Sequence, residues 1–186
     1  MTETVPREGG SSRAGRPGIT VRPARPRDAA SFLAAYQSVA DERLFIQTER
    51  VTRSVRSYRR QFRRPWDERA AHLLALDGDR VVGSLSIRRD DHPAVHHVAT
   101  FGMFVVASHR SHGIGSALVE AALDWARRFG VERIELTVYP HNEAAITLYR
   151  KFGFVEEGRL VRHAKKSYGY EDEILMALWI GPAEVA

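Results

Sequence analysis

RSHGIGS, residues 110–116, lies between two segments of different hydrophobic period. Before it, residues 101–106 (FGMFVV) are mostly apolar and predict a buried strand. After it, apolar residues recur at helical spacing up to Phe129 and predict an amphipathic helix. The first turn of such a helix carries N–H groups without intrahelical partners, and Gly113 and Gly115 have no Cβ to keep a phosphate away. The stretch therefore predicts a site for a phosphorylated ligand.

The spacing of the glycines limits which ligand this is. A P-loop needs a second glycine followed by Lys and then Ser or Thr, and the chain has no such run. A dinucleotide-binding fingerprint needs a third glycine at position 118, which is Leu118. The pattern that remains, Arg-x-x-Gly-x-Gly, resembles the acetyl-coenzyme A loop of the GNAT superfamily of N-acetyltransferases.

A second segment is similar to the other hallmark of that superfamily. Residues 136–154 (LTVYPHNEAAITLYRKFGF) contain a strand that ends near an Asn, then a helix with Ala and Leu-Tyr, then Gly-Phe. Residues 169–178 (GYEDEILMAL) resemble the closing strand of bacterial members. The resemblance covers Ile19 to Trp179 and is closest to bacterial enzymes that acetylate amino acids and other small amines. It implies an α/β fold with a mixed, splayed β-sheet and helices on both faces.

Hydrophobic periodicity and turn residues predict the order of the elements. The predicted strands are residues 19–22, 72–76, 80–87, 97–105, 132–138, 154–161 and 171–178. The predicted helices are one capped by Asp28, a basic one over residues 51–64, one from Ile114 to Phe129 and one over residues 143–151. We expect one domain over residues 19–181, a disordered tail over residues 1–18 and a short tail over residues 182–186.

Composition restricts the class of protein. The chain of 186 residues is 44% hydrophobic and has no cysteine, which excludes disulfides, zinc-thiolate sites and a cysteinyl acyl-enzyme. No apolar run approaches the roughly 18 residues of a membrane span, and no signal-peptide pattern is present. We expect a cytoplasmic enzyme without a membrane partner, and a homodimer stays open.

The net charge of +5 is concentrated in one region. Residues 43–69 hold nine Arg against three acids, although Arg outnumbers Lys throughout the chain. The predicted basic helix is a solvated face or a docking surface for an anionic partner. No aromatic residues alternate with the arginines in the way that base stacking requires, so we do not expect nucleic acid binding.

The resemblance implies the residues that hold acetyl-CoA. Backbone N–H groups of His112, Gly113, Ile114, Gly115 and Ser116 form the pyrophosphate cradle, which Arg110 opens. The side chains of Arg110 and His112 add positive charge or are simply exposed at a loop tip. Backbone groups of Phe104, Val105 and Val106 pair with pantetheine and the thioester carbonyl.

Two residues of the second hallmark have implied roles and plain structural alternatives. Tyr149 corresponds to the tyrosine that protonates the departing thiolate, and its phenol has a suitable ordinary pKa of about 10. The alternative is a core tyrosine on an apolar helix face. Asn142 corresponds to the cofactor-contacting Asn of the family, and it is also a good helix N-cap.

The general base is not assigned by the sequence. In the ribosomal-protein alanine acetyltransferase branch a Glu lies five residues before the motif Asn, and here that position is Thr137. The remaining candidates are Glu42, Glu135, His96 and His97, or a chain of ordered waters. His96 and His97 are expected to point to opposite faces of their strand, so only one of them could reach a site.

The resemblance also implies where the acceptor binds, and it leaves alternative functions open. The family builds its acceptor pocket from the loop between the first two helices and from the C-terminal hairpin, which here hold Glu42, Tyr168, Tyr170 and Glu171. We expect a small-molecule amine as the acceptor. A protein N-terminus of the ribosomal type and a non-catalytic acyl-CoA sensor are the alternatives. Acids and histidines of residues 90–97 have no metal-ligand spacing, so we expect no metal site.

Overall fold

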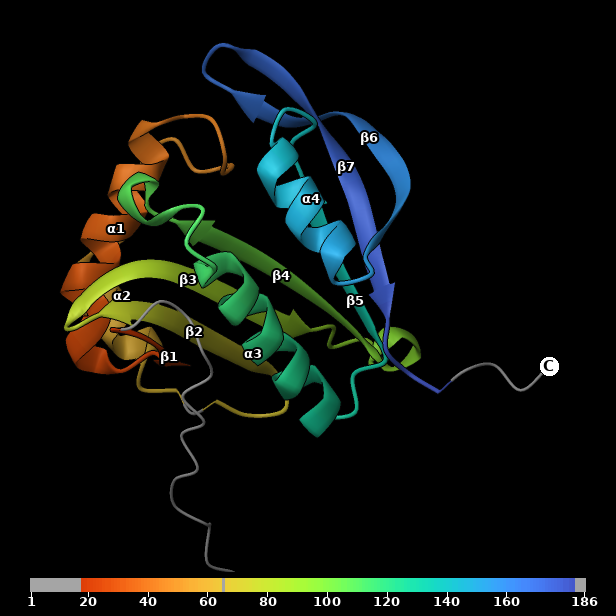
Figure 1. The fold of residues 1–186 in the computed structure, drawn as a ribbon, viewed down its shortest axis with the longest axis horizontal. Coiled ribbons are helices and arrows are strands. Elements are labelled where there is room, and N and C mark those ends of the chain that lie inside the picture. Colours follow the sequence, from red (N-terminus) through yellow and green to blue (C-terminus); the bar gives the residue numbers. More distant parts are fainter. Residues whose placement is uncertain (1–17, 65, 183–186) are drawn as a thin grey trace, which may run out of the picture.

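The computed structural model describes residues 18–64 and 66–182. Its seven strands form one sheet in the order β1-β2-β3-β4-β5-β7-β6 (Figure 1). Strands β4 and β5 are parallel, and the other described neighbours are antiparallel. The strands are β1 Ile19–Pro23, β2 Ala70–Asp77, β3 Arg80–Arg89, β4 Val98–Val105, β5 Arg133–Val138, β6 Val155–Lys166 and β7 Gly169–Trp179.

Helices cover both faces of this sheet, as the sequence predicted. They are α1 Ala29–Asp41, α2 Val55–Gln61, α3 Ile114–Arg128 and α4 Glu143–Lys151. On one face, the Phe32 ring of α1 packs 5.9 Å from Phe104 of β4. On the other face, Tyr149 of α4 packs edge-on against Phe101, with 5.7 Å between ring centroids. Phe101 and Phe104 lie on opposite faces of β4 because side chains alternate along a strand.

The sheet opens in its middle, between β4 and β5. The two strands pair only from Val98 to Thr100 and from Arg133 to Glu135. Beyond this point β4 stays paired with β3 up to Val105, while β5 stays paired with β7 up to Val138. The predicted splay is therefore confirmed, and it leaves an unpaired edge on each strand (Figure 1).

Helix α3 is fixed on the sheet by its apolar face. Trp125 and Leu118 are fully buried, and the Trp125 indole N–H donates a hydrogen bond of 2.9 Å to the carbonyl of Asp67. Near the helix start, a Cβ on Gly83 of β3 would lie 3.2 Å from both Ile114 and Leu118. The absence of a side chain at Gly83 thus lets the first turns of α3 approach the strands closely.

The predicted element order is confirmed, but some boundaries and faces are wrong. The basic helix is short, because Ser54 begins it by accepting a hydrogen bond from Ser57 N and Val51 precedes it. His96 and His97 precede β4, so they do not alternate across the sheet as predicted. The predicted tails lie outside the described residues, apart from Gly18 and Pro182. No helix in the described ranges is long and apolar enough to cross a bilayer.

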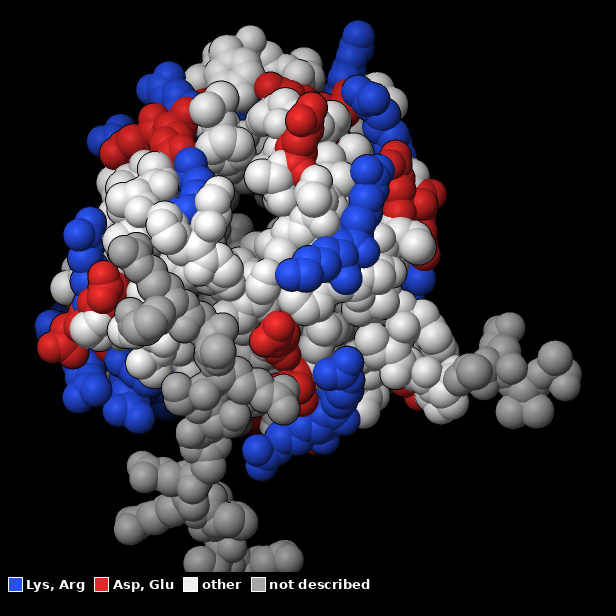
Figure 2. All heavy atoms as spheres, viewed as in Figure 1, with Lys and Arg blue, Asp and Glu red and all other residues white. Residues whose placement is uncertain are grey.

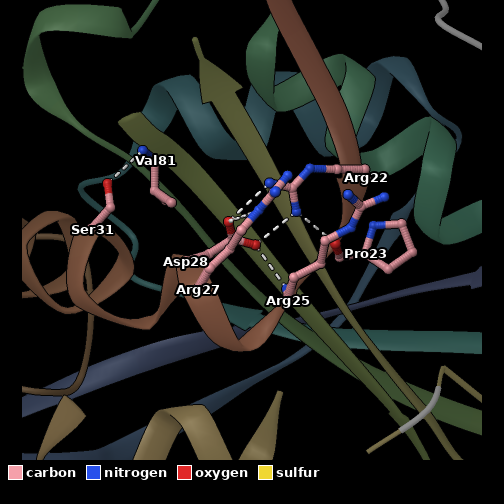
Figure 3. Close-up of polar contacts among 7 residues, drawn as sticks. All are labelled: Arg22, Pro23, Arg25, Arg27, Asp28, Ser31 and Val81. Atoms are coloured by element: carbon pink, nitrogen blue, oxygen red, sulfur yellow. Dashed lines mark hydrogen bonds and ion pairs between the residues drawn. The ribbon is translucent and has the colours of Figure 1, made fainter. Parts of the chain in front are cut away.

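Asp28 occupies the N-cap position of α1, but its carboxylate does not cap the helix. It accepts two hydrogen bonds from the Arg22 guanidinium, at 2.7 and 2.9 Å, and one of 2.7 Å from Arg25 N (Figure 3). Ser31 supplies a further link, since its hydroxyl accepts from Val81 N at 2.8 Å. Asp28 therefore ties the start of α1 to β1.

Candidate active site

The turn between β4 and α3 presents a row of free amide groups. Ser111 and Gly113 have positive φ values of 62° and 78°. At the start of the turn His109 N and Arg110 N donate to the carbonyls of Val106 and Ala107, and the next backbone donor along the described chain is Ala117 N, which donates to Gly113 O at 3.1 Å. The N–H groups of residues 111–116 donate to no backbone acceptor within the described residues, and the positive end of the α3 dipole lies behind them. This geometry suits a phosphate group.

Gly113 and Gly115 are glycine for different structural reasons. Gly113 has left-handed backbone geometry and open space around its missing Cβ. Gly115 lies in the first turn of α3, where a Cβ would come 2.9 Å from the Leu148 side chain of α4. Close approach of α3 to α4, rather than room for a phosphate, therefore explains the glycine at 115.

A cavity of about 770 Å³ extends from this turn into the opening of the sheet. On the turn side it is lined by Ser111, Gly113 and Ser116, and on the α4 side by Asn142 and Tyr149. It continues past Thr137 to the loop that joins α1 and α2 and to β7. Figure 2 shows the surface hollowed between the α1 side and the α4 side. One cavity therefore connects the free amides to the edges of β4 and β5.

The side chains predicted to add charge at the turn are used elsewhere. Arg110 makes two hydrogen bonds of 2.7 Å to the Glu42 carboxylate and one of 3.0 Å to Val105 O. Its guanidinium also lies 4.7 Å from the centre of the Phe45 ring. His112 is exposed, and its Nδ1 lies 2.6 Å from Arg110 O. Arg110 thus fastens the turn to the loop after α1, and its charge is paired with Glu42.

The three residues predicted to contact the cofactor at the end of β4 differ in whether they line the cavity. Phe104 and Val105 line the cavity where β4 has lost its pairing with β5. Val106 does not line it, and both of its backbone groups are occupied: its N–H donates to Val82 O and its carbonyl accepts from His109 N. The predicted cofactor contact at Val106 stays a prediction, although both of its backbone groups already have a partner within the protein.

None of the four candidate bases lines the cavity. Glu42 is bound by Arg110, and Glu135 forms an ion pair of 2.8 Å with Arg133. His96 lies 3.1 Å from the Arg89 guanidinium, and His97 packs near Trp179.

Among the predicted acceptor residues, Tyr168, Tyr170 and Glu171 also lie outside the cavity lining. The cavity therefore does not bring together the bases and acceptor residues that the sequence suggested.

Other polar side chains, which the sequence did not single out, do line the cavity. His72 of β2 lies 2.9 Å from the Ser84 hydroxyl, and burial together with Arg53 lowers the pKa of His72 to about 4. Its imidazole is therefore neutral near pH 7. Gln47 of the loop after α1 donates a hydrogen bond of 2.8 Å to Glu173 of β7. For His72, the signal in the sequence was a polar residue inside an otherwise apolar strand.

Known proteins are similar to this chain in both sequence and fold. Residues 36–154 match the Acetyltransferase (GNAT) family. The chain belongs to this family. It is 38% identical over 123 residues to the L-amino acid N-acetyltransferase of Escherichia coli, covering 60% of this chain and 74% of that protein. It is 30% identical over 122 residues to the [Ribosomal protein bS18]-alanine N-acetyltransferase of Salmonella typhimurium, covering 61% and 80%.

Solved GNAT structures have the same architecture. A GNAT acetyltransferase from Streptococcus pneumoniae superposes with a TM-score of 0.81 at 29% identity, covering 88% of this chain and 99% of that one. A GNAT phosphinothricin acetyltransferase from Sinorhizobium meliloti, in complex with acetyl-CoA, has a TM-score of 0.79 at 19% identity, covering 91% and 92%. This chain is accordingly an acetyl-CoA-dependent N-acetyltransferase of the GNAT family.

Two side chains of this GNAT enzyme face the cavity from α4. Asn142 caps the helix by accepting a hydrogen bond of 3.3 Å from Ala145 N, so the structural alternative for Asn142 is present. Tyr149 is almost fully buried against Phe101 and Phe154. Burial raises the pKa of Tyr149 above its ordinary value, so its phenol keeps its proton throughout the neutral range.

Replacing Gly113 by Ala in this GNAT enzyme should weaken acetyl-CoA binding about five- to thirtyfold. The left-handed backbone at 113 costs an L-residue roughly 1–2 kcal/mol, and a turn that relaxes away from it no longer aligns its amides. Titration calorimetry with acetyl-CoA measures the change. Gly78, in the β2–β3 turn, has a φ of 58° and also has open space around its missing Cβ, so Gly78→Ala is the matched control. Equal affinities of both variants would contradict the prediction.

Proposed function

We propose that this GNAT enzyme transfers the acetyl group of acetyl-CoA directly to a primary amine, namely an amino acid or another small amine. The observation that carries the proposal is the single cavity that joins the free amides of residues 111–116 to the opening between β4 and β5. A thioester bound along that opening would meet an amine that enters from the β7 side. Direct transfer is also consistent with a chain that has no cysteine.

The proposed roles of the residues follow from their places in the cavity. The amides of His112, Gly113, Ile114, Gly115 and Ser116 bind the pyrophosphate. The unpaired edge of β4 near Phe104 and Val105 holds the pantetheine arm, and Asn142 contacts it from α4. Tyr149 gives its proton to the departing thiolate, which the same burial makes more basic.

Two observations favour a small amine. The L-amino acid N-acetyltransferase is the more similar of the two curated relatives described above, at 38% identity. Thr137 also stands where the resemblance to ribosomal-protein enzymes requires a Glu, and it lines the cavity. A neutral hydroxyl at this position cannot act as that base near pH 7.

The test is release of free thiol from acetyl-CoA in the presence of separate acceptors. The panel contains amino acids, polyamines, aminoglycosides and peptides with free N-termini. We expect turnover above the rate of hydrolysis with at least one amino acid or other small amine. If only the peptides are acetylated, the small-amine proposal is wrong.

A second candidate is acetylation of a protein N-terminus, with the arginines of α2 as the docking surface. Arg56, Arg60 and Arg63 are exposed, and basic side chains gather over this region at the lower left of Figure 2. Reversing these three charges to Glu should then lower turnover of an acidic peptide about tenfold or more and spare small amines, because steering acts on the charged partner alone. Equal turnover of both acceptors before and after the change would reject this docking surface.

A further inference from the structure

Two buried polar atoms at the far end of the cavity have no hydrogen-bond partner within the described residues. They are the Tyr139 hydroxyl oxygen, just after β5, and Glu173 Oε2 on β7. Tyr139 is 3% exposed and Glu173 is 2% exposed, and both residues line the cavity. An unpaired buried hydroxyl or carboxylate oxygen is costly, which indicates that a ligand satisfies it.

The sheet brings these two residues together. The last ladder pair between β5 and β7 is Val138 with Ile174, so Tyr139 and Glu173 are the next residues along the two strands. Thr137 is two residues before Tyr139 and therefore lies on the same face of β5. Glu173 is thus a diagonal neighbour of Thr137, roughly 7–8 Å away between Cα atoms.

The other groups around Glu173 do not satisfy its second oxygen. Gln47 binds Oε1, while His163 Nε2 of β6 is 3.8 Å from Oε2, beyond hydrogen-bond distance, and is half-exposed. The ammonium of Lys166, also on β6, donates to the carbonyls of Ile46 and Gln47 and lies 5.2 Å from the Tyr139 ring centre. The remaining titratable groups around Tyr139 are His141, whose ring stacks on it with 5.4 Å between ring centroids, and Glu49, Tyr168 and Glu171.

We infer that Glu173 is the group that binds the protonated acceptor amine and takes its proton, with the Tyr139 hydroxyl accepting a second N–H of the same nitrogen. This inference rests on the proposed function. A carboxylate oxygen and a phenol oxygen are both acceptors, and they suit an ammonium group, which has only donors to offer. Glu173 thereby supplies, from the neighbouring strand, the carboxylate that Thr137 cannot.

The step balances in protons and electrons. The ammonium gives one proton to the Glu173 carboxylate, which leaves a neutral amine and a carboxylic acid. The amine lone pair forms the N–C bond to the thioester carbonyl carbon, the C–S bond breaks, and the sulfur takes the phenol proton of Tyr149. The second proton leaving the nitrogen restores the Tyr149 phenol, and Glu173 releases its proton to water. The products are an N-acetyl amide, CoA thiol and one solvent proton.

The test is Glu173→Gln, which keeps the shape of the side chain and an oxygen for Gln47. With the best acceptor of the panel, kcat/KM at pH 7 should fall about a hundredfold or more, the range of general-base catalysis. The KM for acetyl-CoA should stay unchanged. The variant must take neutral amine from solution, so its kcat/KM should rise about tenfold per pH unit from about pH 7 to 9, while that of the wild type stays nearly flat because the amine is bound as the cation.

The control is Glu49→Gln, an acid-to-amide change in the same wall of the molecule. Glu49 accepts hydrogen bonds from Ser167 and does not line the cavity, so kcat/KM should stay within about twofold. If Glu173→Gln lowers kcat/KM by the same factor at every pH, its role is structural and the inference is wrong. Unchanged kinetics also overturn it.

A second variant keeps the inference testable if Glu173→Gln does not fold, as judged by circular dichroism. Tyr139→Phe removes only the unpaired hydroxyl and should raise the amine KM about three- to tenfold, the effect of one lost hydrogen bond, without changing the acetyl-CoA KM. An unchanged amine KM would overturn the inference. A wild-type enzyme that turns over no amine refutes the proposed function instead, so the two failures are distinct.

Discussion

Tyr149→Phe should lower kcat about a hundredfold while leaving the acetyl-CoA dissociation constant within about twofold. The substitution removes one hydroxyl and keeps the ring that packs against Phe101 and Phe154. A proton donor acts on the departing thiolate, so its loss affects the transition state more than binding. Steady-state kinetics with the best acceptor and calorimetry with acetyl-CoA measure the two quantities.

The pH profile separates this role from a structural one. Burial raises the pKa of Tyr149, and the acid form is the active one, so activity that depends on its proton persists below that value and is lost only as the pH rises through it. We therefore expect no loss from this group up to about pH 10. Tyr168→Phe is the control, because Tyr168 is exposed and outside the cavity lining. Unchanged turnover in Tyr149→Phe would leave Tyr149 as a core residue only.

Trp125→Ala should lower the free energy of unfolding by about 3–5 kcal/mol, the range for removing a buried aromatic side chain. Trp125 is fully buried on α3 and packs 5.7 Å from the Phe129 ring centre. The change also leaves the Asp67 carbonyl without its indole donor. Such a loss is a large part of the 5–15 kcal/mol that is usual for a domain, and urea denaturation measures it.

Trp179→Ala is the matched control for this prediction. Trp179 is 48% exposed at the end of β7, so we expect a loss below about 1 kcal/mol. Trp125→Phe should fall between the two, since it keeps a ring and loses the hydrogen bond to Asp67. A loss below about 1 kcal/mol in Trp125→Ala would contradict the role of this residue in fixing α3.

Local patterns were sufficient for most of the fold. The order of strands and helices agrees with the prediction, and helix α4 has the predicted bounds of Glu143–Lys151. The turn with free amides could also be predicted, because a strand, a glycine and a helix N-terminus are neighbours along the chain. The basic helix was predicted too long, since the arginine pattern continues past Ser54 although the hydroxyl of that residue begins the helix.

The polar residues at the β7 end of the cavity could not be predicted in the same way. The sequence singled out Glu171 of the C-terminal hairpin, whereas the acid of this hairpin that lines the cavity is Glu173. Both side chains fall on the same face of β7, because side chains alternate. Only Glu173 is covered by Gln47, a residue 126 positions away along the chain. No local pattern specifies which of two equivalent acids a distant loop will cover.

The sequence by itself determined the family, the order of the elements and the turn that presents free amides at residues 111–116. These depend on hydrophobic period, glycine positions and helix termini, which are properties of neighbouring residues. The tertiary structure alone decided that Arg110 is paired with Glu42, that Val106 has no free backbone group, and that Glu173 and Tyr139 face the cavity unpaired. Those outcomes depend on contacts between segments far apart in the chain, because burial and pairing are set by what covers a residue after folding.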